Sequence, residues 1–361
     1  MKKEGYLKIL YERVCKNRQI FLHSFDDMKI KQLPTAVFKG DLILHLHWIE
    51  HLYTLGVSGR MRSIYLRFLV MITVPFCLCF LAIARRVLKG KIAFTVHNVV
   101  PHNIYCWRME YIAFRKTLEY AGIVFVHNEY TKTRLSRLYG VNERKLRLVP
   151  HGSWLEAYPN EISKQRARDI LGIQRTRFVL CYFGHIAPYK GLDLLIDAIT
   201  GLDEQSSILT VIVGPPTDAN YFQKLVNKIK SNHDPIDVKL FPCYVPRKSV
   251  QLFMNACDVG VIPYHRITTP GSLILFLSFG KPVIVPALPP IMEVAGKKAC
   301  FYFKPRDSSS LRLTIMNAVN NKQKSEKMGE LAQRRAKTLD WERNVAVTYN
   351  SYLELLEGVE N

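Results

Sequence analysis

The stretch FGHIAPYKGLDLLIDAI, residues 183–199, joins an apolar run to an amphipathic helical pattern through a short loop. Gly184 would let a ligand approach the backbone, and Lys190 would place an ammonium group beside that ligand. Because ligands of parallel α/β sheets bind where strands end, this lysine could hold an anion such as a diphosphate. A solvated lysine in an ordinary loop is the alternative, and it is the commoner fate of such a residue.

A second candidate anion site needs no charged side chain. In ITTPGSLILFLSFGKPVIVP, residues 267–286, Thr269 or the threonine before it could cap a helix, and Pro270 suits its first turn. Free backbone N–H groups and a serine hydroxyl at such a start can bind phosphate. The residues expected to provide them are Gly271, Ser272 and Leu273. An ordinary capped core helix would explain the threonine and the proline equally well.

Histidines and glutamates follow the strand-like runs of the first half of the chain, and TVHNVVPHN, residues 95–103, carries two histidines around a proline. A side chain with a pKa near the working pH could serve as general base toward an acceptor hydroxyl. We favour His97 for this role, with Glu129 and Glu50 as rivals. The residues expected on the acceptor side are His47, His102 and Asn103. Each of these side chains could instead cap a strand end or hydrogen-bond to a ligand.

Apolar runs of strand length alternate with helical patterns throughout the chain, which predicts an α/β fold with parallel sheets. The strands expected in the first half are residues 41–48, 91–98, 122–128 and 145–151. Those expected in the second half are residues 178–184, 207–214, 238–244, 258–264 and 282–287. The polar stretch 154–177 separates the halves and indicates a domain junction.

These segments resemble the GT-B glycosyltransferases of family 4. Lys190 and Gly191 match the lysine and glycine with which that family opens its second domain, and His185 stands where the family has an arginine. Further similar motifs are SVQLFMNACDVGVIPY (249–264), SFGKPVIVP (278–286), PPIMEVAG (289–296) and LRLVPHG (146–152). Two glutamates of the family are missing, because their positions fall at about Thr268 and Leu275, and an inverting reaction is therefore open.

The resemblance implies two Rossmann-like domains with a cleft between them. We expect an acceptor and membrane-facing domain over residues 1–155, a nucleotide-sugar domain over 165–340, and a last helix, 341–361, that crosses back to the first domain. The residues implied in donor binding are Gly184, His185, Lys190, Tyr244, Thr269, Gly271, Ser272, Leu273 and Glu293. There is no D-x-D and no G-x-G-x-x-G motif, so we expect metal-independent transfer without a cofactor, the nucleotide diphosphate sugar being a co-substrate.

The formal charge is +21, and residues 1–150 hold 25 basic and 10 acidic side chains. This excess favours an anionic partner such as a phospholipid surface. Residues 68–84 carry no charge and lie between cations, which allows a core helix, a membrane span or a helix in the membrane interface; we favour the last. Eight cysteines without a C-x-x-C pair, and an N-terminus without a signal-peptide pattern, favour the cytoplasm, with the protein peripheral or monotopic on the inner face of the plasma membrane.

The sequence thus predicts a hexosyltransferase that adds a sugar to a membrane-associated, lipid-linked saccharide in surface polysaccharide or glycolipid assembly. A non-catalytic homologue that acts as a membrane-bound scaffold or partner subunit is the alternative. Nucleic-acid binding is not expected, because the basic residues are scattered and no aromatic ladder accompanies them.

Overall fold

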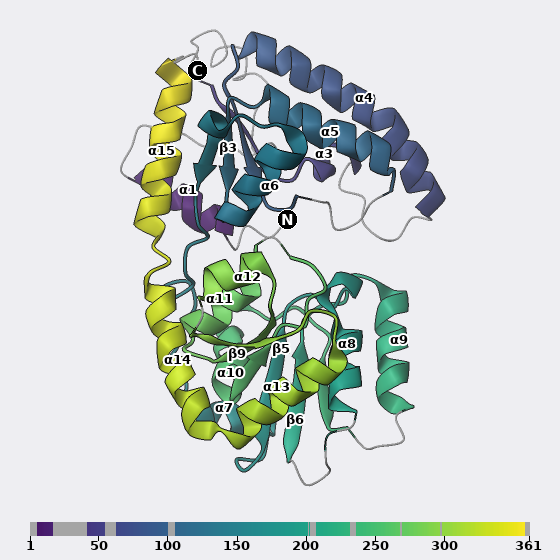
Figure 1. Ribbon diagram of the computed structural model, residues 1–361, viewed down its shortest axis with the longest axis vertical. Helices are drawn as coiled ribbons and strands as arrows, with labels where there is room; N and C mark the ends of the chain where they lie inside the picture. Colours follow the sequence, from purple (N-terminus) through teal and green to yellow (C-terminus); the bar gives the residue numbers. More distant parts are fainter. Residues whose placement is uncertain are drawn as a thin grey trace. The chain divides into compact units, whose positions relative to one another are not determined.

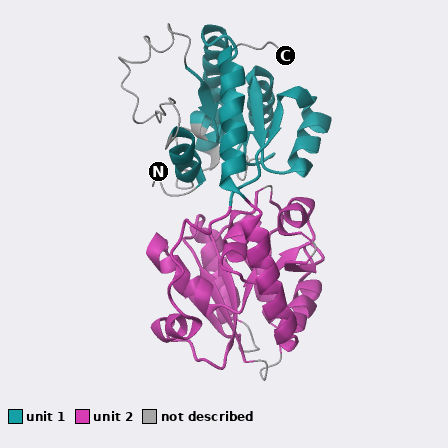
Figure 2. Ribbon diagram, turned by 90° about the vertical axis from the view of Figure 1, so that its left-hand side faces the viewer, with its two compact units in different colours: residues 1–152, 340–361 teal, residues 153–339 magenta. Residues whose placement is uncertain are grey.

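The computed structural model describes residues 6–16, 42–54, 63–99, 105–200, 202, 207–231, 236–267, 269–296 and 298–357. The chain divides into two compact units, which we call unit 1 (residues 1–152 and 340–361) and unit 2 (residues 153–339) (Figure 2). Unit 2 is therefore inserted in the sequence of unit 1.

In its described part, unit 1 has a parallel sheet in the order β1-β2-β3-β4. These strands are β1 (Leu44–Leu46), β2 (Ile92–Val96), β3 (Ile123–Val126) and β4 (Leu146–Leu148). Its helices are α1 (Tyr6–Lys16), α3 (Glu50–Thr54), α4 (Ser63–Val87), α5 (Trp107–Tyr120), α6 (Glu129–Tyr139) and α15 (Trp341–Glu357).

Helices cover both faces of this sheet (Figure 1). Successive strand residues point to opposite faces, so neighbouring residues of β2 and β3 pack into different core clusters. Ala93 and Phe125 share one core cluster with residues of α1 and α15, whereas Phe94 and Val124 share another with residues of α4 and α5. The strands are thus buried on both sides, as their unbroken apolar runs predict.

In unit 2 the described strands form a parallel sheet in the order β10-β9-β8-β5-β6-β7. They are β5 (Phe178–Phe183), β6 (Ile208–Val213), β7 (Val238–Phe241), β8 (Val259–Val261), β9 (Val283–Pro286) and β10 (Cys300–Phe303). The helices are α7 (Lys164–Leu171), α8 (Leu192–Ile199), α9 (Ala219–Lys230), α10 (Val250–Ala256), α11 (Gly271–Ser278), α12 (Pro289–Ala295), α13 (Ser308–Asn320) and α14 (Lys322–Lys337). Each segment predicted as a strand contains one, and β10 is a strand that the sequence pattern did not predict.

Helix α11 lacks charge because it is buried: Leu273, Ile274, Leu275, Phe276 and Leu277 are each at most 5 % exposed. A helix that is apolar all round belongs in a core. The cap expected at Thr269 is wrong, since Pro270 occupies the N-cap position and the described residues show no side-chain hydrogen bond there; Thr268 lies outside the described residues.

Trp154 fixes helix α11 at both ends. Its indole N–H donates to the carbonyl oxygen of Gly271 (3.2 Å), and its backbone N–H donates to the hydroxyl oxygen of Ser278 (2.9 Å). Because Trp154 itself is 9 % exposed, these hydrogen bonds lie largely out of water and hold the start of α11 in place.

Candidate functional site

In unit 2, the carboxyl end of β5 meets the start of α11. A side chain at Gly184, where φ is +151°, would lie 3.2 Å from the Ser272 hydroxyl and 3.6 Å from that of Tyr264. A side chain at Gly214, after β6, would lie 1.9 Å from the carbonyl oxygen of Gly184. Only glycines fit these two strand ends, and they leave backbone accessible where a parallel sheet binds ligands.

Lys190 belongs to a single 3-10 turn, Pro188–Lys190, and its ammonium lies 3.8 Å from the centroid of the Tyr264 ring. Burial alone lowers the pKa of this lysine, but Tyr264 and Tyr189 outweigh that effect and the net pKa is raised. The group is therefore a cation at neutral pH, half-buried and seated on an aromatic face.

Tyr264 connects the predicted donor-binding residues. Its hydroxyl donates to the Ser272 hydroxyl oxygen (3.1 Å) while its ring contacts the Lys190 ammonium. Gly184, Lys190 and Ser272 are thus brought together, as the sequence predicts. Tyr264 was not among the predicted site residues, although its place at the end of the segment 258–264 was a usable signal.

The anion site at the start of α11 is smaller than expected. The N–H of Gly271 donates to the carbonyl oxygen of Thr269 (3.1 Å), so it is not free. Among the described residues, the N–H groups of Ser272 and Leu273 have no such backbone bond, and a side chain at Gly271 would meet no described atom within 4 Å. Two amides and one hydroxyl therefore remain to face a ligand.

His185 is exposed in part, and its backbone carbonyl accepts from the Tyr182 hydroxyl (2.6 Å). Desolvation, and then the charge of Lys190, lower the pKa of its ring. The histidine in the place of the family's arginine is therefore neutral near pH 7, and Lys190 supplies the positive charge. Of the remaining predicted donor-side residues, Tyr244 is half-exposed after β7, and the backbone carbonyl of Glu293, in α12, accepts from Arg335 (2.9 Å).

In unit 1, histidines line the carboxyl edge of the sheet. His47 follows β1, His97 follows β2, His127 follows β3 and His151 follows β4. Nδ1 of His47 lies 3.0 Å from Nε2 of His97, and Nδ1 of His97 lies 3.3 Å from Nε2 of His127. The side chains of His47, His97 and His127 are therefore hydrogen-bonded to one another across neighbouring strands, whereas Nδ1 of His151 lies 2.7 Å from the carbonyl oxygen of Gly152.

Burial lowers the pKa of each of these histidines. The pKa of His127 falls to about 4 and that of His151 to about 3. The pKa values of His47 and His97 lie well below the usual range. Neighbouring histidines also lower the pKa values of His151, His47 and His97. Because desolvation penalises the charged form, all are neutral at pH 7.

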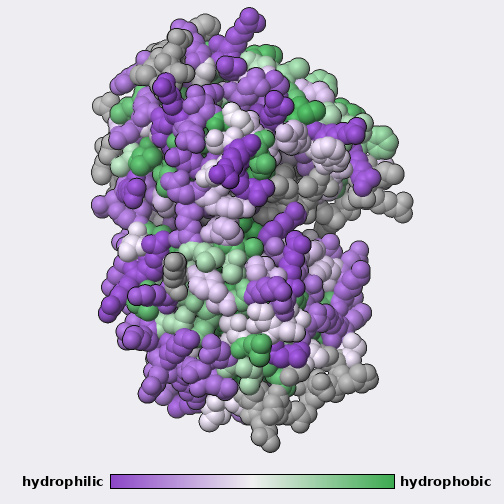
Figure 3. Space-filling model, in the orientation of Figure 1, coloured by the Kyte–Doolittle hydropathy of each residue, from purple (hydrophilic) through white to green (hydrophobic). Residues whose placement is uncertain are grey.

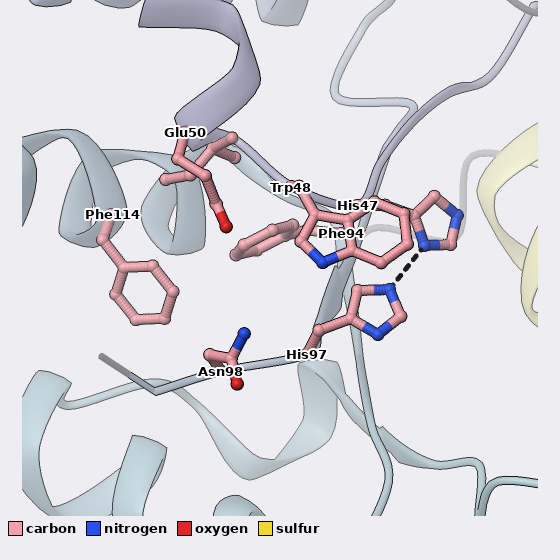
Figure 4. A pocket seen from close by; sticks show the side chains of 8 residues that line it. His47, Trp48, Glu50, Phe94, His97, Asn98 and Phe114 are labelled. Atoms are coloured by element: carbon pink, nitrogen blue, oxygen red, sulfur yellow. Dashed lines mark hydrogen bonds between the residues drawn. The ribbon is translucent and has the colours of Figure 1, made fainter. Parts of the chain in front are cut away.

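A small pocket, open to solvent in part and with room for about one water molecule, lies at this edge (Figure 4). It is lined by His47, Trp48, Ile49, Glu50, Phe94, His97, Asn98 and Phe114. The Trp48 indole stacks on the His97 ring, with centroids 4.2 Å apart and planes at 11°. Glu50 is the acidic residue among those that line the pocket.

The other acceptor-side predictions have different outcomes. Glu129 is exposed at the start of α6 and is not among the residues that line the pocket. His102 and Asn103 lie outside the described residues. Among the residues that the structure describes, no group of three or more His, Cys, Asp or Glu side chains could hold a metal ion.

Residues 163–335 match the family model "Glycosyl transferases group 1". A GDP-mannose:glycolipid 4-beta-D-mannosyltransferase from Xanthomonas campestris pv. campestris is 23 % identical over 87 % of this chain and 80 % of its own length. A putative teichuronic acid biosynthesis glycosyltransferase from Bacillus subtilis is 25 % identical over 60 % of this chain and 51 % of its own.

Solved structures show the same fold. HepE from Anabaena, crystallised with UDP and glucose, superposes with a TM-score of 0.67 at 18 % identity and covers 78 % of this chain and 80 % of its own. WaaG, a glycosyltransferase involved in lipopolysaccharide biosynthesis, gives 0.59 at 18 % identity over 72 % and 74 %. Residues 163–335 therefore form a group 1 glycosyltransferase domain, and the chain is a glycosyltransferase with the GT-B fold.

Proposed function

We propose that this enzyme transfers a hexosyl group from a nucleotide diphosphate sugar to a lipid-linked saccharide at a membrane surface, without a metal ion. The observation that carries the proposal is the grouping of the Lys190 ammonium, Tyr264 and Ser272 beside the glycine end of β5. Such a grouping suits the diphosphate of a donor. The HepE complex with UDP-glucose, in a structure of the same fold, and the glycolipid acceptor named for the Xanthomonas relative support the two substrates.

The leaving group determines what unit 2 has to do. When the bond between the anomeric carbon and the diphosphate oxygen breaks, that oxygen takes the electron pair and becomes more negative. The half-buried Lys190 and the N–H groups of Ser272 and Leu273 are donors that could stabilise this charge, and they are already fixed in place. His185, being neutral, would donate a hydrogen bond at most.

The acceptor would bind in unit 1, over the sheet edge that carries Trp48, Glu50 and His97. An aromatic pair beside a carboxylate and the Asn98 amide suits a sugar, which has both apolar faces and hydroxyl groups. The two positions where the family has glutamates are not acidic here, so the donor sugar would lack those partners, and an inverting transfer is open beside a retaining one.

Helix α4 supports binding at a membrane. Its segment Tyr65–Val87 is long and apolar enough to cross a bilayer. Of the most apolar stretch of this segment, only 22 % is buried inside the protein. One side, with Val70, Val74 and Leu81, belongs to the core of unit 1. The other side exposes Phe68, Ile72, Phe76 and Ile83, which are between 60 and 72 % exposed, and apolar side chains gather there in Figure 3.

Because one side of α4 is fixed to the sheet domain, we propose that the helix lies in the membrane interface and does not cross the bilayer. Arg85 and Arg86 in its last turn would contact lipid phosphates. Trp107 and Tyr111 of the adjacent helix α5 are 63 and 40 % exposed and would sit at headgroup level. The cytoplasmic face of the plasma membrane, which carries anionic lipid, is the surface that we propose.

The membrane proposal predicts that the double variant Ile72→Asp/Phe76→Asp loses binding to phosphatidylglycerol vesicles. Each apolar side chain contributes about 1.5–3 kcal/mol when buried, so the partition constant should fall at least about a hundredfold. Co-sedimentation measures this fall. Leu313→Asp, at a residue of α13 that is 71 % exposed, is the matched control and should leave binding unchanged. Equal retention of the double variant and the wild type would contradict the proposal.

The proposed reaction is tested by incubating the full-length enzyme with a panel of nucleotide sugars and a membrane extract that contains lipid-linked saccharides. We expect one donor to release its nucleoside diphosphate and to label the lipid fraction. Nucleotide release without labelled lipid would exclude the lipid-linked acceptor, and no release from any donor would contradict the proposed function.

A further inference from the structure

Tyr264 contacts two of the groups that would bind the diphosphate of the donor, yet it is itself only 1 % exposed. Its hydroxyl lies 3.1 Å from the Ser272 hydroxyl oxygen, and the Lys190 ammonium lies 3.8 Å from the centroid of its ring. Ser272 and Lys190 are half-buried and keep part of their surface accessible. A ligand could therefore touch these two residues, whereas Tyr264 would act on it only through them.

The hydrogen bond between the two hydroxyl groups has a preferred direction. A phenol is a stronger acid than an alcohol, and the ammonium above the ring draws electron density from it, so Tyr264 is the better donor. The Ser272 oxygen then accepts from Tyr264, and its own proton points elsewhere. Among the described residues, that proton meets no hydrogen-bond acceptor. The Ser272 hydroxyl thus has a proton to donate to a ligand oxygen.

Tyr182 does not compete for this hydrogen bond. It is fully buried in β5, and its hydroxyl donates to the backbone carbonyl oxygen of His185 (2.6 Å). Gly184 makes room for both phenols, since a side chain there would lie 3.5 Å from the Tyr182 hydroxyl and 3.6 Å from that of Tyr264. The hydroxyl protons of Tyr182 and Tyr264 are therefore committed, and that of Ser272 is not.

The Lys190 ammonium has no carboxylate partner among the residues that the structure describes. Asp193, at the start of α8, is engaged elsewhere: its carboxylate lies 3.0 Å from the Tyr221 hydroxyl and 3.6 Å from Nε2 of His265. The face of the Tyr264 ring holds the lysine instead. A cation held by an aromatic face and not by an anion keeps its charge available for a bound diphosphate.

We propose that Tyr264 is a positioning residue of donor binding: its hydroxyl turns the Ser272 proton toward the diphosphate, and its ring holds the Lys190 ammonium beside it. This inference rests on the proposed function, because it assigns roles within the donor site. Two donors of different kinds, a hydroxyl and an ammonium, are set by one side chain that the ligand does not touch. Loss of Tyr264 should therefore act through Ser272 and Lys190 and not as the loss of a third contact.

A double-mutant cycle tests the role of the hydroxyl. Isothermal titration calorimetry would measure how the full-length protein binds UDP, GDP and inorganic pyrophosphate. Ser272→Ala should raise Kd about 10- to 100-fold, the usual effect of losing a hydrogen bond to a charged group, and Tyr264→Phe about 3- to 10-fold. The double variant should bind like Ser272→Ala, because the Tyr264 hydroxyl acts through Ser272. Single effects that multiply in the double variant would overturn the proposal.

Tyr182→Phe is the matched control, because it removes a buried phenol hydroxyl beside Tyr264 without touching Ser272. Any effect of Tyr182→Phe should multiply with that of Ser272→Ala, as expected for residues that act independently. If Tyr182→Phe also lost its effect in the Ser272→Ala background, the coupling of Tyr264 would reflect a general loosening of the core, and the positioning role would be refuted.

Replacement of the ring tests the role toward the lysine. Lys190→Ala should raise Kd about tenfold or more in the wild type and in Tyr264→Phe, which keeps the ring, but at most about threefold in Tyr264→Leu. Equal losses in the Phe and Leu backgrounds would contradict this role. If Tyr264→Leu does not fold, the cycle of Tyr264→Phe with Ser272→Ala still decides the proposal.

The same measurements separate this inference from the proposed function. A wild-type protein that binds none of the three probes would contradict the proposed donor site, and this inference with it. Binding by the wild type without coupling between Tyr264 and Ser272 would overturn the inference and leave the proposed function standing.

Discussion

Lys190→Ala is expected to lower kcat by about 10²–10³-fold, the usual effect of removing one fixed donor to a developing negative charge. The reason is that His185 is neutral near pH 7, so among the residues gathered around Tyr264 the positive charge comes from Lys190. Donor binding should weaken as well, because in the proposed site the ammonium would also contact the ground-state diphosphate. Steady-state kinetics with the donor found in the screen would measure both effects.

A surface lysine provides the control for this variant. Lys224→Ala, on the exposed side of α9, removes the same charge from unit 2 away from the Tyr264 grouping and should leave kcat unchanged. Lys190→Arg should retain part of the rate, because it keeps the charge but not the compact ammonium that fits over the Tyr264 ring. Wild-type kinetics in Lys190→Ala would refute the assignment of the donor site.

Gly191→Ala is expected to destabilise unit 2 by about 3–5 kcal/mol, a loss that puts it among the most damaging single substitutions. The residue has φ of +66°, and a side chain there would lie 2.1 Å from the backbone carbonyl oxygen of Pro263. Backbone would have to move, and it would move next to Lys190. Urea unfolding measures the loss of stability, and donor binding by the surviving folded protein should weaken with it.

Gly172→Ala separates backbone strain from collision. This glycine has nearly the same φ, +62°, but a side chain there would meet only the flexible end of Lys239, at 3.5 Å. The strain alone should cost about 1–2 kcal/mol. If both alanine variants lost the same stability, the close approach of Pro263 to Gly191 would have no energetic meaning.

The sheets could be predicted because buried parallel strands leave a plain pattern. Runs such as FVLCYF and ILTVIV have no polar alternation, and each is a strand buried on both faces. Strand β10 escaped prediction because its core, CFYF, is short and follows a pair of lysines. The N-cap of α11 was wrong for a local reason: the N–H of Gly271 turns back to Thr269 and leaves Pro270 at the cap position.

The residue types at the candidate sites could be predicted from the sequence, but the contacts between them could not. Histidines could be seen to follow strands, but their bonds depend on lateral register, with Leu46 opposite Phe94 and Val96 opposite Val126. No sequence period encodes that register. The same holds for Tyr264, since its ring meets Lys190 only because β5 and β8 are neighbours in the sheet.

The chain enters and leaves unit 2 at neighbouring positions, and this bears on whether unit 2 can be exchanged as a whole. The N–H of Ser153 donates to the carbonyl oxygen of Leu339 (2.9 Å), so the first and last residues of the inserted unit are adjacent. A segment whose ends touch can be removed or exchanged as one piece, because a short linker is enough to rejoin the two parts of unit 1. Recombination at the two ends of residues 153–339 would therefore exchange unit 2 as a whole and leave the sheet and helices of unit 1 unchanged.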